Sequence, residues 1–418
     1  TNISEIDIPE TVTSIGAYAA QDTKISQAVF PSSFKYVPEG FFCNCKNVTS
    51  IDFLSSAFTG LRNACFSGCS ITDLDFSKTN ITYIGDYAFG GCESLKTVVL
   101  NKNTTYLSGF NNCPNLEHVE FTDKITAIGQ SAFKDDENTT FSAIPDSVYQ
   151  VYSMAFQNSG ITQAVFNTTN DSPGISTYAF AKCKKLSRVA LPERLNTIAS
   201  GTFLDCSLKS ITVPNAVTTV GDYAFEGSLI ESVKIGKNSS LKYIRETAFA
   251  NCVNLTSFTI PKNAWTVYKN AFCGDINLKT VIVNSPNVNF NENPFSLSKG
   301  DEKACCISKI YGYEDSSAKY FAEKMGIEFA LISDMTDYPD SDEDYASTNK
   351  GTWENGTWVY DENTERLLIK GSGVLSSTFK NANGTEISIV NYLSGKELNN
   401  IVICEGITGV ADDVFYSE

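Results

Sequence analysis

A phenylalanine set between small residues recurs at nearly constant spacing through the first 300 residues, and alanine replaces it once. We call these positions anchors; consecutive anchors are 21 to 24 residues apart. The anchors are Ala20, Phe42, Phe66, Phe89, Phe110, Phe133, Phe156, Phe180, Phe203, Phe225, Phe249, Phe272 and Phe295. A period of roughly 20–30 residues is typical of a solenoid, in which each unit buries its apolar face only against its neighbours. We therefore expect a repeat array of about 13 units over residues 1–300.

Charge and apolar content limit the partners of such an array. The 418-residue chain has 32 Lys and Arg against 48 Asp and Glu, which gives a formal net charge of −16. Affinity for nucleic acid and for anionic membrane surfaces comes from clustered basic side chains, so neither partner is expected. No apolar run approaches the roughly 20 residues that span a bilayer, and we expect no signal peptide in the given sequence. Membrane insertion is not expected within this segment.

Most of the 13 cysteines follow the repeat rather than a disulfide or zinc pattern. Seven stand three residues after an anchor: Cys45, Cys69, Cys92, Cys113, Cys183, Cys206 and Cys252. At the same position other units carry Thr23, Asp136, Ser159, Ser228 and Asp275. Such variation indicates a small-residue position, where a thiol packs as a small apolar group. We expect free, mostly buried thiols, with one or two disulfides as the alternative, and neither a metal nor another cofactor, since zinc-like spacing is absent.

Each unit has two recognisable halves. The first has the outline L-x-x-L-x-L, as at 208–213 and 255–260, and ends in a period-two alternation that predicts a short strand with one buried face. Proline often follows and ends the strand pairing, because it has no amide hydrogen to donate. In the second half an apolar residue stands five places before the anchor. The glycine that follows it in four units (Gly16, Gly85, Gly129, Gly221) predicts a bend that is crowded or has positive φ.

The apolar strand, the Ile-Pro step, the V-x-x-I-G-x-x-A-F run and the x-x-C-x-x-L after it together resemble the BspA-type leucine-rich repeat, over about residues 1–300. The resemblance implies a right-handed leucine-rich repeat solenoid, mainly β, in an extracellular or cell-surface protein. It also implies adhesion or protein–protein interaction, with host or microbial surface proteins, extracellular-matrix proteins or glycans as partners. The family has no general catalytic motif, so the resemblance assigns no role to any residue.

The periodicity stops after Phe295, and three further segments follow. Residues 301–332 predict a strand, a helix over 315–325 and a second strand, which would cap the open apolar end of the solenoid. Residues 333–349 are rich in Asp and predict an exposed acidic linker. Residues 350–418, with Trp353 and Trp358, predict a second, small β-module that leads into a restarted repeat.

The outward side chains of the predicted strands form the candidate binding surface, which we call the strand face. Its candidate residues are Asp52, Asp73, Asp75, His118, Glu120, Gln163, Arg188, Ser210, Thr212, Ser232, Lys234, Ser257 and Thr259. Its amino-terminal half is acidic, and its carboxy-terminal half is hydroxylated and weakly basic. Small hydroxyl side chains leave a flat hydrogen-bonding surface, which suits an extended partner better than a pocketed substrate.

Asp73, Asp75, His118 and Glu120 form the one constellation with acid–base or metal chemistry. The acidic pair and the His–Glu pair belong to coils two steps apart. With coils about 4.8 Å apart, the pairs stand roughly 10 Å from each other, too far for one metal ion and too open for a strongly shifted pKa. We therefore predict a non-catalytic binding protein. The alternative is an accessory or scaffolding region of a larger cell-wall or carbohydrate-active protein.

Overall fold

The computed structural model describes residues 3–51, 58–166, 172–236, 238–300 and 304–334, followed by 350–361, 366–371, 373–375, 379–381, 386–387, 400–403 and 407–410. The chain forms two compact units, and the boundary between them along the chain falls after Met335. The first unit is a solenoid that ends in a strand–helix–strand segment, and the second is a small β-unit. The fold is mainly β with one α-helix among the described residues, so the predicted fold class is confirmed.

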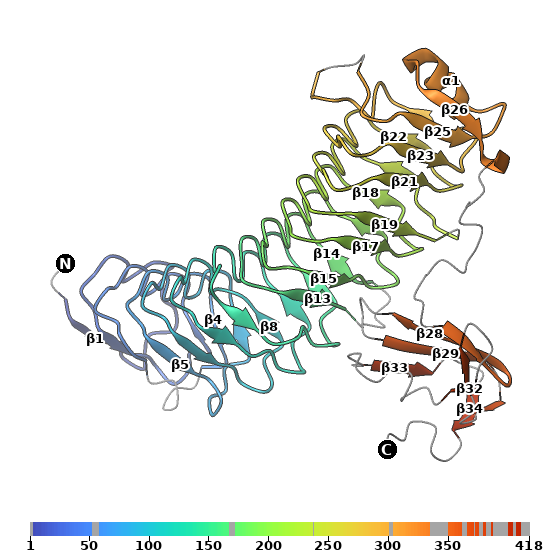
Figure 1. Ribbon diagram of the computed structural model, residues 1–418. Helices are drawn as coiled ribbons and strands as arrows, with labels where there is room; N and C mark the ends of the chain where they lie inside the picture. The colour runs from blue at the N-terminus through green and yellow to red at the C-terminus, as the bar shows by residue number, and fades with distance from the viewer. Residues whose placement is uncertain are drawn as a thin grey trace. The chain divides into compact units, whose positions relative to one another are not determined.

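One short strand from most coils lies along one side of the solenoid, in a series of short parallel sheets that we together call the first ladder (Figure 1). Its strands are β1 (Glu5–Asp7), β2 (Gln27–Val29), β5 (Asp73–Asp75), β7 (Thr97–Val99), β9 (His118–Val119), β11 (Thr140–Phe141), β13 (Gln163–Val165), β15 (Arg188–Ala190), β17 (Ser210–Val213), β19 (Ser232–Ile235), β21 (Ser257–Ile260) and β23 (Thr280–Val283). Side chains alternate along these strands, and β5 runs exposed, buried, exposed. The first ladder therefore turns one set of side chains to the core and the other to solvent, as the L-x-x-L-x-L outline predicts.

A second ladder of parallel two-residue strands runs along another side of the coils. Its strands are β3 (Tyr36–Val37), β4 (Gly60–Leu61), β6 (Tyr83–Ile84), β8 (Tyr106–Leu107), β10 (Ala127–Ile128), β12 (Gln150–Val151), β14 (Gly174–Ile175), β16 (Thr197–Ile198), β18 (Thr219–Val220), β20 (Tyr243–Ile244), β22 (Thr266–Val267) and β24 (Asn289–Phe290). In β6, Ile84 is buried and Tyr83 is exposed. The buried residue is the apolar one that stands five places before the anchor. The pairing itself was not predicted, because two residues are too few for an alternation to be read.

The anchor phenylalanines form one continuous stack through the core. From Phe42 to Phe295, consecutive anchor rings have centroids 5.1–5.9 Å apart and interplanar angles of at most 22°. All of these rings are buried. The stack explains why the spacing of anchors is held so narrowly, since a shifted ring would leave a void between its neighbours.

The position three residues after the anchor is a hydrogen-bonding site in the core. All twelve cysteines that the structure describes are free, as predicted. In the seven coils with cysteine at this position, the thiol donates to the anchor carbonyl oxygen of the preceding coil over 2.9–3.3 Å, as from Cys92 to Phe66. Burial raises the pKa of the Cys92 thiol to about 12 and of the Cys183 thiol to about 11, which keeps both protonated as donors.

Most coils turn through two residues with positive φ, one lying two places before the anchor and one two places after it. Tyr87 (φ 59°) is an example of the first and Asn44 (φ 59°) of the second. The sequence predicted that the glycines of the bend are either crowded or have positive φ. None of the four has positive φ, so the second alternative is wrong. Crowding is confirmed at Gly85, where a Cβ would lie 2.9 Å from the carbonyl oxygen of Leu61.

A strand–helix–strand cap follows the last coil (Figure 1). It consists of β25 (Lys309–Gly312), α1 (Ser317–Met325), β26 (Glu328–Leu331) and the 3-10 turn η1 (Ile332–Asp334). Strands β25 and β26 continue the first ladder in parallel beyond β23. The Ser316 side chain caps the helix by accepting a hydrogen bond from the Lys319 amide. The centroid of the Phe321 ring lies 4.8 Å from the centroid of the Phe290 ring and 6.0 Å from that of the Phe295 ring. Helix α1 therefore covers the open end of the phenylalanine stack.

The second unit is built on a six-stranded sheet of order β32-β31-β27-β28-β29-β33, with a separate parallel pair β30-β34. Its strands are β27 (Lys350–Trp353), β28 (Gly356–Asp361), β29 (Arg366–Gly371), β30 (Gly373–Leu375), β31 (Phe379–Asn381), β32 (Glu386–Ile387), β33 (Asn400–Ile403) and β34 (Ile407–Val410). Trp358 is fully buried, and its Nε1 donates to the carbonyl oxygen of Lys380 over 2.9 Å. Most of the predicted acidic linker (335–349) and the end of the restarted repeat (411–418) lie outside the described residues.

Candidate functional site

The amino-terminal half of the strand face is a column of polar side chains held in register. Parallel pairing of β5, β7, β9 and β11 aligns Asp73, Thr97, His118 and Thr140. Thr97 Oγ1 donates to Asp73 Oδ1 over 2.5 Å, and His118 Nδ1 lies 2.8 Å from Thr140 Oγ1. The hydrogen bond from Thr97 lowers the pKa of the exposed Asp73 carboxyl. These side chains are therefore linked pairwise across neighbouring coils.

Thr140 is a strand-face residue that the sequence did not reveal. In most units that have a proline after the strand, the outward positions precede it by a fixed number of residues. Pro261 directly follows β21, but Pro145 stands four residues after Phe141, the last residue of β11. The longer segment between β11 and Pro145 shifts the outward positions relative to the proline, so the sequence pattern does not identify this strand. Asp52, the first residue of the predicted strand-face set, lies outside the described residues.

The acid–base constellation is not brought together. Thr97 stands between Asp73 and His118 in the aligned column, which keeps the carboxylate and the imidazole two coils apart, as predicted. Asp75 Oδ1 accepts a hydrogen bond from the Ser77 amide over 2.8 Å, and the Ser77 side chain, followed by this amide, lowers the pKa of the Asp75 carboxyl. Glu120 is exposed just beyond the end of β9. Within the described ranges, no group of three or more His, Cys, Asp or Glu side chains is arranged to hold a metal ion.

The carboxy-terminal half of the strand face is a surface of small hydroxyl side chains. Ser210 pairs with Ser232 and Thr212 with Lys234 across β17 and β19. Further along, the column that contains Ser257 continues through Thr280 to Lys309 and Glu328 of the cap. Gln163 and Arg188 begin the neighbouring strands β13 and β15, and Thr259 points outward from β21.

The cap adds a charged end to this surface. Lys309 Nζ lies 2.8 Å from Glu328 Oε1, and the same ammonium group lies 4.9 Å from the centroid of the Tyr311 ring. Sequence reasoning assigned this segment to capping alone. Because β25 and β26 extend the first ladder in register, the cap contributes to the strand face as well.

The outward side of the second ladder carries aromatic and basic side chains. Near the amino terminus, the Tyr83 and Tyr106 rings stack with centroids 5.0 Å apart, and the Tyr106 hydroxyl donates to Asp86 Oδ1 over 2.8 Å. Burial and this carboxylate raise the pKa of Tyr106. The Arg62 guanidinium lies 5.4 Å from the Tyr36 ring centroid, beside a surface hollow of about 480 Å³. Other coils carry Gly60, Ala127 or Gln150 at the ladder position of Tyr83 and Tyr106, so no regular pattern in the sequence predicted this surface.

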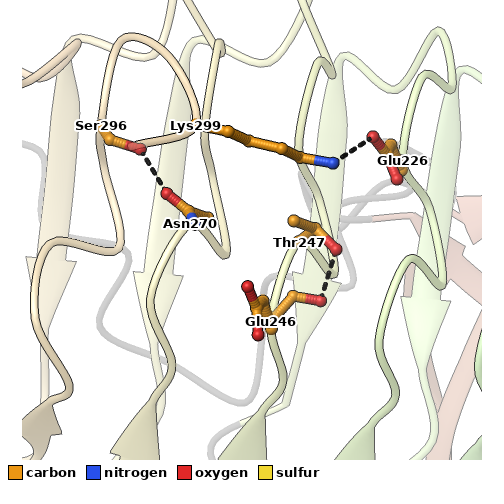
Figure 2. Close-up of polar contacts among 6 residues, drawn as sticks. All are labelled: Glu226, Glu246, Thr247, Asn270, Ser296 and Lys299. Carbon is orange, nitrogen blue, oxygen red and sulfur yellow. Dashed lines mark hydrogen bonds and ion pairs between the residues drawn. The ribbon is translucent and has the colours of Figure 1, made fainter. Parts of the chain in front are cut away.

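The loop after the last anchor folds back along the solenoid (Figure 2). Ser296 Oγ donates to Asn270 Oδ1 over 2.8 Å, and Lys299 Nζ lies 3.3 Å from Glu226 Oε1. Glu226 directly follows an anchor three coils before Phe295. Lys299 therefore crosses several coils to pair with this carboxylate, and its ammonium group also lies 5.6 Å from the Tyr223 ring centroid.

Comparisons with known proteins agree with the architecture. The model of the BspA type leucine rich repeat region matches residues 1–80, 59–174 and 173–300. A leucine-rich repeat protein from Bacteroides ovatus is 23% identical over 79% of this chain and 84% of its own, with a TM-score of 0.61. A leucine rich cell surface protein from Faecalibacterium prausnitzii is 17% identical over 77% and 90% of the two chains (TM-score 0.40), and the pneumococcal vaccine antigen PcpA is 15% identical over 79% and 89% (TM-score 0.39). No curated protein matches the chain. The family match covers well over half of the sequence, and the chain belongs to the BspA-type leucine-rich repeat proteins.

Proposed function

We propose that this protein is a non-catalytic binding protein whose strand face holds an extended segment of a partner protein. The observation that supports this most strongly is the column of exposed polar side chains from Asp73 to Thr140, aligned one per coil. Donors and acceptors that repeat at one coil spacing match a partner that runs along the solenoid axis. A flat face of this kind offers hydrogen bonds along a line and does not enclose a small substrate.

The internal hydrogen bonds of the column favour binding. Thr97 holds Asp73, and Thr140 contacts His118, before any partner arrives. Side chains that are already ordered lose less conformational entropy on association, which saves roughly 0.5–1.5 kcal/mol for each immobilised side chain. The acidic half and the hydroxylated half of the face then favour different parts of the partner.

Location at the cell surface is part of the same proposal, with host or microbial surface proteins or extracellular-matrix proteins as the class of partner. The family membership supports an adhesive role of this kind. Among the described residues, no helix is long and apolar enough to cross a membrane. Antibody labelling and mild protease treatment of intact cells test the location, because a surface protein is labelled and cleaved without lysis.

Binding to immobilised fibronectin, fibrinogen and a glycan array tests the proposed partner class. We expect micromolar or tighter binding to a protein ligand, reduced at least tenfold by Asp73→Ala combined with His118→Ala. Lys102→Ala, an exposed substitution away from the strand face, is the matched control and should change affinity less than twofold. Flat responses to all proteins, binding to glycans alone, or equal losses in both variants would contradict the proposal.

A further inference from the structure

We propose that a basic aromatic cluster on the second ladder binds an acidic segment of a partner protein. The cluster consists of Lys242, Tyr243, Arg245, Trp265 and Tyr268, from the adjacent coils that contain β20 and β22. It lies on a different ladder from the strand face. The inference therefore goes beyond the proposed function and can fail or succeed independently of it.

The five side chains form one continuous chain of contacts. Lys242 Nζ lies 4.4 Å from the Trp265 ring centroid, and the Trp265 and Tyr243 rings meet edge to face with centroids 5.8 Å apart. The Arg245 guanidinium carbon lies 5.2 Å from the Tyr243 centroid and 4.8 Å from the Tyr268 centroid. Two cations are thus positioned by three aromatic rings that project from neighbouring rungs of the same ladder.

The rings hold the cations without neutralising them. A cation over an aromatic face is attracted by the ring quadrupole, yet it keeps its full charge. Neither Lys242 nor Arg245 forms an ion pair with a carboxylate in the part of the chain that the structure describes. Glu246 directly follows Arg245 without pairing with it, and Glu226 on a preceding coil is paired with Lys299 (Figure 2). Both cations therefore remain available to an external carboxylate, and Arg245 can bind one through two parallel hydrogen bonds.

The charge around the cluster differs from that of the whole molecule. Residues 188–300 carry 11 Lys and Arg against 8 Asp and Glu, a formal net charge of +3, whereas the whole chain has −16. One of these eight, Asp275, is fully buried, and desolvation raises the pKa of its carboxyl to about 9. An acidic partner is therefore attracted to this half of the solenoid and repelled from the rest of the chain.

The aromatic content indicates a protein partner rather than a uniform polyanion. The Trp265 side chain is 55% exposed, which leaves a large apolar surface in water beside the two cations. Trp, Tyr and Arg are the residue types that dominate the energetics of protein–protein interfaces. Nucleic acids and polyanionic glycans rely on many basic side chains along a stripe, and this cluster has two. The chemistry fits a short segment in which Asp or Glu stands next to an apolar side chain.

The test uses the full chain and a fluorescent 12-residue peptide of alternating Asp, Glu and Leu, with an Asn/Gln version of the peptide as the ligand control. We expect the acidic peptide to bind and the amide peptide not to bind, with an affinity that falls as NaCl rises from 50 to 200 mM. Arg245→Gln and Trp265→Ala should each weaken binding at least fivefold. Lys184→Gln removes one exposed cation that lies outside both the cluster and the strand-face set, and it should change the affinity less than twofold.

Melting temperatures of all variants establish that they are folded, and Arg245→Lys, which keeps the charge but loses the paired hydrogen bonds, provides a milder substitution. It should weaken binding by an intermediate factor. Absence of peptide binding, tighter binding of polygalacturonate or of a single-stranded oligonucleotide, or an equal loss in Lys184→Gln would overturn the proposal. The strand-face proposal is tested separately, by the binding of the variant that combines Asp73→Ala with His118→Ala.

Discussion

Seven coils carry a cysteine three residues after the anchor, and its sulfur atom explains why the residue recurs. Sequence variation among Cys, Ser, Thr and Asp predicted a small position. It did not reveal the hydrogen bond from the thiol to the preceding coil, because that partner is more than 20 residues away.

We expect Cys92→Ala to lower the free energy of unfolding by about 1–2 kcal/mol through the lost bond and the small cavity. Cys92→Ser, which keeps a donor, should cost less; urea unfolding measures both, and equal losses would refute the hydrogen-bonding role.

Two coils carry aspartate at this position, and these residues make stability depend on pH. Asp136 and Asp275 are fully buried; one carboxyl oxygen accepts an amide hydrogen from Cys113 or Cys252, and the other has no hydrogen-bond partner. Desolvation raises the pKa of Asp136 to about 8 and that of Asp275 to about 9. Since these values exceed those of the unfolded chain, the folded protein binds more protons above about pH 4. The contribution of these residues to stability therefore falls as pH rises from about 4 to 9.

Replacing both aspartates with serine, the residue found in two other coils, removes this dependence. We expect Asp136→Ser with Asp275→Ser to be more stable than the unsubstituted protein by at least about 2 kcal/mol at pH 9, and by much less at pH 5. Urea unfolding at both pH values measures the difference. Asp146→Ser, at an exposed site, is the control and should show no such change. A constant difference between the two pH values would show that the carboxyls are not protonated in the folded state.

At the scale of the elements, the two ladders differ in how far the sequence predicts them. The first ladder could be predicted because its strands alternate buried and exposed residues before a proline. The second ladder depends on pairs such as Tyr83–Ile84, which have no local signature, and on turns with positive φ occupied by ordinary residues such as Tyr178 (φ 57°). Contacts between coils hold these turns, so the information lies about 23 residues away in the sequence.

Tyr178 and Gly201 illustrate such a contact. Gly201 has a φ of 62°, and a Cβ on it would lie 2.2 Å from Cε1 of the Tyr178 ring of the preceding coil. We expect Gly201→Ala to destabilise the protein by about 2–3 kcal/mol, from the left-handed backbone and the displaced ring. In Tyr178→Ala/Gly201→Ala the clash is absent, so the cost should be smaller than the sum of the single changes. Thermal unfolding of the cycle measures the coupling; Gly16→Ala, with no atom within 4 Å of its Cβ, is the control, and strict additivity would count against the contact.

For the molecule as a whole, the repeat predicts where surfaces lie better than what they bind. The alternation of residues in the sequence predicts that Asp73, His118 and Ser210 point outward from the first ladder, as their strands show. The cluster around Arg245 and Trp265 could not be predicted in this way, because it depends on side chains that meet across coils and occur once. In such a chain the repeated residues specify the scaffold. The residues that depart from the repeat are the candidates for function.

The solenoid should also unfold locally, from one coil to the next, and the cap should stabilise its carboxy-terminal coils. Phe321 of α1 packs on the last ring of the stack, so Phe321→Ala should expose the Phe295 end and cost about 3 kcal/mol locally. Because the anchor rings stack between adjacent coils, the loss should be confined to the carboxy-terminal part of the array. We expect hydrogen exchange to accelerate at β22, β24 and β25 and to stay unchanged at β5, β7 and β9. Tyr320→Ala, at a side chain that is 70% exposed, should leave exchange unaltered, and a uniform acceleration in Phe321→Ala would instead establish that the solenoid unfolds as a single cooperative unit.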